Sequence, residues 1–171
     1  YKSTTRDVRL ILDSLKAENV DGVLLDLRNN GGGSLQEAIE LTGLFIDKGP
    51  VVQVRQVNNK VDIERDSEAG VKWDGPFGVI INRFSASASE IFAGAIQDYG
   101  RGIVLGSTTY GKGTVQSAIE MERFISPTNK LLIKASGEKK DADTPQGAPE
   151  FGQINVTIAK FYRVNGSSTQ H

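Results

Sequence analysis

The sequence has 171 residues, with 20 basic and 21 acidic side chains, and this length is enough for one domain with a buried core. The net charge of −1 does not favour a nucleic acid or an anionic membrane surface as partner. Because the chain has no cysteine, disulfides, thiol nucleophiles and thiolate metal sites are excluded.

The only histidine is His171, the last residue of the chain. Terminal residues are often poorly ordered, so we expect neither a Ser-His-Asp triad nor a histidine-bound metal. Any nucleophilic chemistry must then use a lysine or a carboxylate as its base, and we predict no cofactor. The sequence contains neither an apolar run of about 18 residues nor a signal peptide, so we predict no membrane span. Because it opens directly into a helical pattern, we expect a fragment of a longer protein.

The first half of the chain alternates helical and strand patterns. In chain order they predict a helix over residues 4–18, a strand over 23–27, a helix opening at Ser34, and a hairpin of strands 51–57 and 61–65 around Asn58 and Asn59. The nearly continuous apolar run of residues 23–27 is typical of a strand buried on both faces. Ser34 and Glu37 match a capping box, which predicts where the second helix begins.

The second half repeats this alternation and adds a polar stretch. It predicts a strand over residues 77–81, a serine-rich turn at 85–89, a helix that Gly100 ends, and strands over 103–105, 114–121 and 154–164. Residues 126–150 are mostly polar, and we predict a strand-like piece at 131–133 followed by a flexible loop. Strands that alternate with helices indicate a single α/β domain over residues 1–171, with its sheet covered by helices.

A glycine-rich turn lies between the strand predicted at 23–27 and the helix that opens at Ser34. It reads DLRNNGGG and spans residues 26–33. Consecutive glycines let the backbone turn sharply and expose its N–H groups, and N–H groups at a helix N-terminus bind anions. The anion would be a phosphate or the oxyanion of an acyl-transfer intermediate, and the alternative is a tight turn with no ligand.

Ser87 is our candidate nucleophile. It lies just before a predicted helix, among Ala and Ser residues whose small side chains leave room for a substrate backbone. Ala88, at the start of that helix, offers an N–H group next to the serine, where half of an oxyanion hole is usually found. The alternative is structural, because Ser87 and Glu90 also match a capping box.

Lys112 is our candidate base. It lies between two glycines after a predicted strand. A lysine acts as a base only when it is neutral, a state that burial against apolar neighbours can favour. Gln116 would lie on the same side of an extended segment, where its amide would orient the amine. The alternative is a phosphate-binding loop over residues 106–112, but Gly113 stands where Ser or Thr should hold magnesium, and a strand is predicted to follow.

Four segments of the chain resemble one protease family. They read VLLDLRNNGGG, RFSASASEIFAGAIQDYGR, GSTTYGKGTVQ and IAKFYRVNGSSTQ. They are similar to the carboxy-terminal processing proteases, most closely to the tail-specific branch, over residues 20–125 and 153–170. The resemblance implies a serine endopeptidase of the bacterial periplasm or cell envelope that uses a Ser-Lys dyad. It also implies protein or peptide substrates that are recognised through exposed C-terminal tails.

The resemblance assigns roles to individual residues. It implies Ser87 as nucleophile, Lys112 as base, Gln116 as the residue that orients the base, the N–H groups of Gly33 and Ala88 as the oxyanion hole with Gly32 in support, and Glu90, Asp98 and Thr109 as supporting scaffold. The implied fold is the α/β core of crotonases and Clp proteases. In that core, strand-strand-helix units stack around a mainly parallel sheet that helices cover.

The chain departs from this family in one respect. Family members carry a PDZ domain that binds the substrate tail, and this sequence leaves no room for one. We therefore expect the chain to be the catalytic core alone, with weak or no peptidase activity in isolation. The alternative is a non-catalytic peptide-binding or scaffolding module of the same fold.

Overall fold

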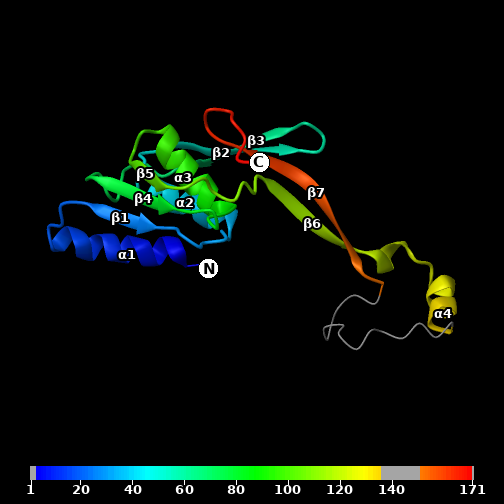
Figure 1. Cartoon of the computed structure of the whole chain (residues 1–171). Coiled ribbons are helices and arrows are strands. Elements are labelled where there is room, and N and C mark those ends of the chain that lie inside the picture. The colour runs from blue at the N-terminus through cyan, green and yellow to red at the C-terminus, as the bar shows by residue number, and fades with distance from the viewer. Residues whose placement is uncertain (1–2, 136–150, 171) are drawn as a thin grey trace. The chain divides into compact units, whose positions relative to one another are not determined.

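The computed structural model describes residues 3–135 and 151–170, and the chain divides into two compact units (Figure 1). Unit 1 contains the described residues up to Val115 and those from Ala159 onward, and unit 2 is Gln116–Ile158. Strands β6 (Thr114–Glu120) and β7 (Gln153–Tyr162) each contribute residues to both units. No helix in the described ranges is long and apolar enough to cross a membrane.

Unit 1 alternates helices and strands, as the sequence predicts. Its elements are α1 (Thr4–Ala17), β1 (Val23–Asp26), α2 (Leu35–Gly43), β2 (Gly49–Gln56), β3 (Val61–Asp66), β4 (Phe77–Ile81), α3 (Ala88–Asp98) and β5 (Ile103–Gly106), followed by the unit 1 ends of β6 and β7. The Ser34 hydroxyl accepts a hydrogen bond from the Glu37 N–H at 3.4 Å, which confirms the predicted cap of α2. Gly100, with a φ of 58°, follows the end of α3 as expected.

Two sheets contain these strands. β1, β4 and β5 form a parallel sheet, in which Val79 of β4 pairs with Leu25 on one side and Val104 on the other. The second sheet has the order β3-β2-β7-β6, and β2 pairs antiparallel with both β3 and β7. The predicted hairpin is confirmed as the β2–β3 connection, where Asn59 has a φ of 65°. These elements confirm the expected α/β class.

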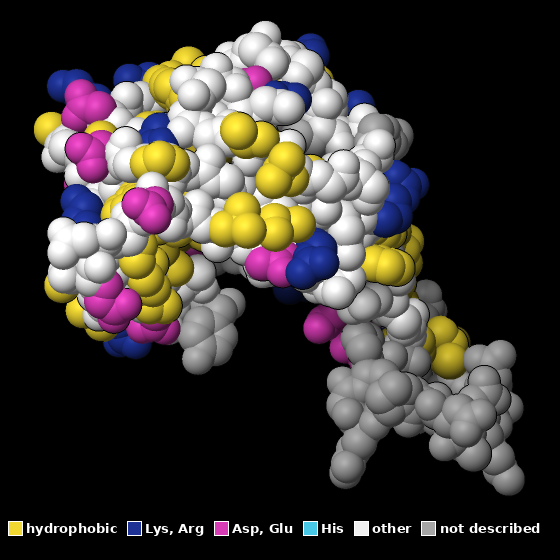
Figure 2. All heavy atoms as spheres, turned by 60° about the vertical axis from the view of Figure 1, so that its left-hand side comes forward, with side chains coloured by type: hydrophobic (Ala, Val, Ile, Leu, Met, Phe, Trp, Pro, Cys, Tyr) yellow, Lys and Arg dark blue, Asp and Glu magenta, His cyan; other side chains and the backbone are white. Residues whose placement is uncertain are grey.

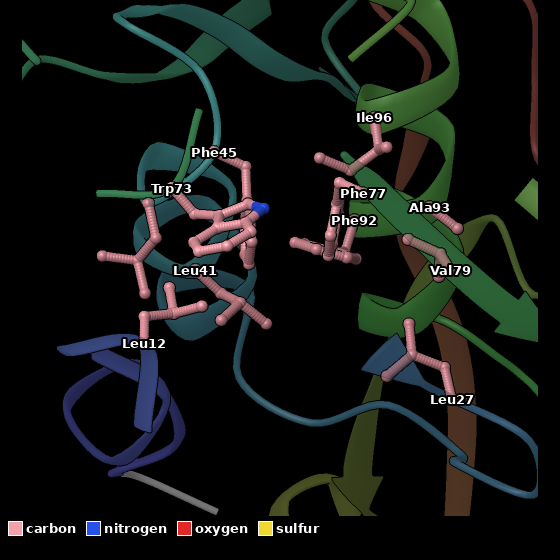
Figure 3. Packing of buried hydrophobic residues seen from close by; sticks show 11 residues of the cluster. Leu12, Leu27, Leu41, Phe45, Trp73, Phe77, Val79, Phe92, Ala93 and Ile96 are labelled. Carbon is pink, nitrogen blue, oxygen red and sulfur yellow. The ribbon is translucent and has the colours of Figure 1, made fainter. Parts of the chain in front are cut away.

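The main core of unit 1 lies between the parallel sheet and the helices. Its buried residues come from all three helices of this unit, from β4 and from three connecting segments: Leu12, Leu27, Leu41, Leu44, Phe45, Trp73, Phe77, Val79, Phe92, Ala93 and Ile96 (Figure 3). Phe45 stacks on Phe77 with ring centroids 4.1 Å apart and meets Phe92 edge-on at 5.9 Å. Because β4 leads from this core into the serine-rich turn and α3 leads back into it, buried packing fixes both ends of the turn.

The opposite face of the parallel sheet is open to solvent. Leu24 of β1 is 58% exposed, and Ile103 and Leu105 of β5 are 66% and 49% exposed. The prediction that the strand at 23–27 is buried on both faces is therefore wrong. Its burial alternates, because only every second side chain packs on the core. Figure 2 shows hydrophobic side chains gathered in patches on the surface, with charged side chains beside them.

Unit 2 contains most of β6 and β7, the 3-10 helix η1 (Met121–Phe124) and helix α4 (Pro127–Ala135). The strand-like piece predicted at 131–133 is wrong, since these residues lie in α4. The Ser126 hydroxyl accepts a hydrogen bond from the Asn129 N–H at 3.3 Å, and Pro127 is the first helical residue, so a Ser-Pro pair sets the start of the helix. The rest of the predicted loop, residues 136–150, lies outside the described residues.

Candidate active site

The serine-rich turn after β4 holds Ser87 in an unusual backbone conformation. Ser87 is the N-cap of α3, with a φ of 57° and a ψ of −116°. A positive φ costs a residue other than glycine about 1–2 kcal/mol, so other contacts must hold it there. The Ser87 N–H donates to the Glu90 carboxylate at 2.7 Å, and the Ser87 carbonyl accepts from the N–H groups of Glu90 and Ile91. The predicted pairing of Ser87 with Glu90 at the helix start is thus confirmed.

The glycine-rich loop after β1 is fastened to this turn by the serines that flank Ser87. The Ser89 hydroxyl donates to the Asn30 carbonyl at 3.2 Å and to the Asn30 side-chain oxygen at 3.0 Å. The buried Ser85 hydroxyl donates to the Leu27 carbonyl at 2.8 Å. The loop and the turn, which lie more than 50 positions apart in the sequence, therefore form one connected structure.

Gly32 marks the close approach of the glycine-rich loop to Ser87. It has a φ of 91°, and a Cβ atom built on it would lie 2.6 Å from the Ala86 carbonyl oxygen and 2.8 Å from the Ala88 nitrogen. Both the backbone conformation and the space therefore require glycine. The Gly32 N–H donates to the Asn30 side chain at 2.9 Å. This contact supports the loop.

Two N–H groups close to Ser87 have no acceptor among the described residues, namely those of Gly33 and Ala88. Ala88 is the first residue of α3, and the first N–H groups of a helix have no partner within it. Both residues line one cavity of about 110 Å³, together with Gly32. The two donors that the sequence analysis assigned to an oxyanion hole thus border a common space.

This cavity has a mixed lining. Its apolar wall consists of Leu27, Ala38, Leu41, Ala88 and Phe92, and its polar wall includes Thr4, Asn30, Ser34, Glu37 and Ser89. The Glu37 carboxylate is already bound, because it accepts hydrogen bonds from the Thr5 N–H at 2.8 Å and the Thr5 hydroxyl at 2.9 Å. The free space therefore suits a small group with apolar character.

The loop that carries Lys112 is held by the same carboxylate that holds Ser87. Glu90 is only 4% exposed. Its Oε1 accepts from the Gly111 N–H at 2.7 Å, and its Oε2 accepts from the Lys112 N–H at 2.9 Å. Gly111 is buried and has a φ of 87°, a conformation that glycine adopts without strain. One buried side chain therefore connects the backbone of the candidate nucleophile with that of the candidate base.

The Lys112 side chain itself is exposed. Among the described residues it therefore lacks the burial against apolar neighbours that can favour a neutral amine. The reason is that the backbone N–H groups of the loop turn inward to Glu90, which leaves the side chain on the outside. Within the described ranges, the Ser87 hydroxyl and the Lys112 amine form no hydrogen bond with each other. Catalytic hydrogen bonds are often long in free enzymes, and the dyad stays a prediction.

Three further residues were predicted at this site, namely Asp98, Thr109 and Gln116. Asp98 ends α3, at the opposite end of the helix from the nucleophile, and pairs with Arg163. The Thr109 carbonyl accepts a hydrogen bond from the Arg83 guanidinium at 2.9 Å. The supporting role of Asp98 and Thr109 stays a prediction. Gln116 is the first residue of unit 2, and its position beside the base stays a prediction.

Sequence reasoning missed three residues that hold the site: Asn30, Arg163 and Gln170. Asn30 had a local signal, since an asparagine between a strand and a run of glycines commonly bonds to nearby backbone groups. Arg163 and Gln170 had none, because their partners lie 65 and 57 positions away in the chain. Their role becomes visible only once the chain is folded.

The alternative phosphate-binding loop over residues 106–112 lacks its structural context. Such a loop leads into a helix whose N–H groups face the phosphates. Here Thr114 begins strand β6, and the N–H groups of Gly111 and Lys112 already donate to Glu90. These residues are therefore not arranged to bind a nucleotide.

The sequence matches the family described as Peptidase family S41 over residues 1–171. The chain belongs to peptidase family S41. The resemblance to carboxy-terminal processing and tail-specific proteases is thereby confirmed. The glycine-rich loop, the Ser87 turn and the Lys112 loop are parts of an S41 peptidase fold.

Curated relatives of this S41 chain are considerably longer. The tail-specific protease of Haemophilus influenzae is 44% identical over 170 residues, which cover 99% of this chain and 22% of the relative. Carboxyl-terminal-processing peptidase 2, chloroplastic, of Arabidopsis thaliana is 41% identical over 154 residues, which cover 84% of this chain and 30% of the relative. The carboxy-terminal processing protease CtpA of Bacillus subtilis is 38% identical and is covered to 38% of its length. The chain thus spans well under half of each.

Solved structures confirm the fold. The photosystem II D1 C-terminal processing protease matches with a TM-score of 0.76 and 25% identity, over 99% of this chain and 37% of that one. Mature CPAF complexed with lactacystin matches with a TM-score of 0.71 over 98% of this chain and 40% of that one, and its 13% identity shows the fold alone. The expected core, shared with Clp proteases, is therefore correct.

Proposed function

We propose that this S41 chain carries the Ser-Lys active site of a serine endopeptidase. Ser87 is the nucleophile, Lys112 is the general base, and Gln116 orients the base. The observation that carries the proposal is the strained backbone of Ser87 at the start of α3, beside the N–H groups of Gly33 and Ala88, which have no acceptor in the described residues. Nucleophilic serines of hydrolases occupy strained strand-to-helix turns of this kind, next to such N–H groups.

The proposed reaction is acyl transfer. Neutral Lys112 removes the proton of the Ser87 hydroxyl, and the oxygen attacks the carbonyl carbon of a peptide bond. The N–H groups of Gly33 and Ala88 stabilise the negative charge that develops on the carbonyl oxygen. Protonated Lys112 then gives its proton to the leaving amine. A water molecule hydrolyses the acyl-enzyme, with Lys112 again acting as base.

The proposed substrates are proteins recognised through their C-terminal tails. The support comes from relatives whose names describe tail-specific or carboxyl-terminal processing proteases. Because the chain spans under half of these relatives, we propose that a PDZ domain elsewhere in the protein binds the tail and that this chain alone cleaves weakly or not at all. We also propose a bacterial cell envelope or periplasmic location, which cell fractionation would test.

The first test removes the two proposed catalytic groups. In the full-length protein, Ser87→Ala and Lys112→Ala should each lower turnover by about 10³-fold or more, since neither the nucleophile nor the base has a substitute. The melting temperature should change little, because the Lys112 side chain is exposed and alanine keeps the Cβ atom of Ser87. Turnover is measured on a peptide with an apolar C-terminal tail and on the same peptide with a charged tail.

The control is Lys16→Ala, which removes an exposed lysine of α1 and should leave turnover unchanged. Retained peptidase activity in either Ser87→Ala or Lys112→Ala would refute the dyad. Equal turnover of the peptides with apolar and charged tails would contradict recognition through the C-terminus. It would not contradict the dyad.

A non-catalytic peptide-binding module is the second candidate. The observation that favours it is the exposed side chain of Lys112, which has no hydrogen bond to Ser87 in the described residues. An active-site serine probe followed by mass spectrometry separates the two candidates. A label on Ser87 supports the peptidase. Peptide binding with neither label nor cleavage supports the module.

A further inference from the structure

The backbone of the Lys112 loop is bound over four successive residues. Four successive N–H groups, from Tyr110 to Gly113, each donate to an acceptor from elsewhere in unit 1. The Tyr110 N–H donates to the Ser85 carbonyl at 3.0 Å, and the next two N–H groups donate to Glu90. The Gly113 N–H donates to the side-chain oxygen of Gln170 at 3.0 Å. The first two acceptors belong to the Ser87 turn and α3, but the last belongs to the C-terminal part of the chain.

Gln170 is brought to the loop by residues 163–170, which we call the return segment. β7 ends at Tyr162, and the chain then turns, with Gly166 at a φ of 89°. The Arg163 N–H donates to the Ser167 carbonyl at 2.8 Å, and Ser168 forms an antiparallel bridge with Tyr162. Asn165 and Gly166 lie in this turn, where the Gly166 N–H donates to the Arg163 carbonyl at 2.9 Å. The return segment thus runs back along the end of β7.

Gly113 is shaped to receive the return segment. It is buried, and a Cβ atom built on it would lie 2.5 Å from the Gln170 nitrogen and 2.8 Å from the Thr169 hydroxyl oxygen. Its carbonyl accepts a hydrogen bond from the Phe161 N–H of β7 at 2.8 Å. The residue directly after Lys112 is therefore clamped between β7 and the return segment, at a distance that only glycine allows.

The other end of the return segment is anchored on α3. The Arg163 guanidinium donates to both carboxylate oxygens of Asp98, at 2.5 and 3.2 Å, and the Asn165 amide donates to the same carboxylate at 2.8 Å. The Asp98 side chain is only 5% exposed. A two-point, charge-assisted contact of this kind fixes orientation as well as distance. The segment therefore links the helix that begins at Ser87 to the loop that carries Lys112.

We propose that Gln170 is a positioning residue for Lys112. The inference rests on the function proposed above and deepens it, because it names a group that fixes the position of the base Lys112. The Lys112 side chain is exposed, so the contacts of its backbone determine where the Lys112 Cα atom lies relative to Ser87. Glu90 holds this backbone on one side, and Gln170 holds it on the other. A displacement of about 1 Å in a catalytic group can lower turnover by about 10²-fold.

The test compares two substitutions of Gln170 in the full-length protein. Gln170→Leu keeps the size of the side chain and removes the acceptor, whereas Gln170→Glu keeps an oxygen that accepts from the Gly113 N–H. We expect Gln170→Leu to lower kcat by about 10- to 100-fold with an unchanged KM, since the loop shifts but the substrate contacts remain. Gln170→Glu should keep most of the activity. Gln36→Leu, the same change at an exposed position of α2, is the control.

Each outcome decides for or against the proposal. Wild-type kcat in Gln170→Leu would overturn it. A loss that Gln170→Glu does not rescue, or one that appears equally in KM, would also overturn it and leave a merely structural role. If Gln170→Leu does not fold, Gln170→Ala removes the same acceptor without adding an apolar group, and the same comparison applies. A failure of the dyad itself is recognised separately, because Ser87→Ala would then remain active.

Discussion

The two halves of the proposed dyad are built differently. The backbone of Ser87 is fixed by Glu90, and its turn is tied to the glycine-rich loop, so its position is determined down to the Cβ atom. The backbone of Lys112 is equally fixed, but its side chain is exposed. Ordering a lysine side chain costs up to about 2 kcal/mol of conformational entropy. The difference teaches that this fold preorganises the nucleophile and its N–H donors and leaves the amine to be ordered when the dyad forms.

Glu90 is shared by both halves, so its substitution should have the largest effect. In Glu90→Gln, one of the two acceptor oxygens becomes an amide nitrogen, which faces N–H groups of Ser87, Gly111 or Lys112. Buried N–H groups without an acceptor should lower the free energy of unfolding by about 2–4 kcal/mol. Turnover should also fall, because nucleophile and base are displaced together. Chemical denaturation and a peptidase assay measure the two effects.

Glu40→Gln is the matched control for this substitution. Glu40 is an exposed residue of α2 whose side chain bonds only to Gln36 among the described residues, so its loss should change the free energy of unfolding by less than about 0.5 kcal/mol. If Glu90→Gln is as stable as Glu40→Gln, then the carboxylate does not join the two halves.

The nucleophile half alone is tested by Gly32→Ala. The new methyl group would lie 2.6 Å from the Ala86 carbonyl oxygen in a backbone with a φ of 91°, so the loop must move away from Ser87. We expect a loss of about 1–3 kcal/mol in the free energy of unfolding and a strong fall in kcat. Gly31→Ala is the control, because no atom lies within 4 Å of a Cβ built there. Equal effects of the two substitutions would contradict the close approach.

The smallest expected effect concerns strain at the nucleophile. Ser87→Gly should raise the free energy of unfolding by about 0.5–1 kcal/mol, since glycine adopts a φ of 57° without a Cβ clash and loses only part of this gain to the unfolded chain. Ser87→Ala keeps the Cβ atom and should show no such gain, although both variants lack the nucleophile. Thermal unfolding of the pair measures the difference. A destabilised Ser87→Gly would mean that the conformation is not strained.

Local signals in the sequence predicted the nucleophile half well. The capping pattern of Ser34 and Glu37 placed the start of α2, and the pattern of Ser87 and Glu90 placed the start of α3. Both signals involve residues three positions apart, so the contacts that begin each helix can be predicted from a short stretch of sequence. The glycine-rich loop was identified for the same reason, since a run of glycines indicates special backbone conformations wherever it occurs.

The position of the Lys112 loop and the exposure of one sheet face depend on contacts between residues far apart in the sequence. A short stretch of sequence does not reveal such contacts. Gln170 reaches Gly113 from 57 positions away, and nothing in its surroundings marks it. The apolar run of β1 indicated burial, but a run of apolar residues does not say how many faces of a sheet are covered. The run at 131–133 was equally ambiguous between helix and strand, and the Ser-Pro pair before it was the signal that decides.

The open face of the parallel sheet has a practical consequence for anyone who purifies this chain. Leu24 on β1 and Ile103 and Leu105 on β5 present apolar side chains to water on either side of β4. Salts such as ammonium sulfate strengthen the association of exposed apolar surface. The chain should therefore bind tightly to hydrophobic-interaction resins at high salt, and Leu24→Lys, on the open side of β1, should elute earlier.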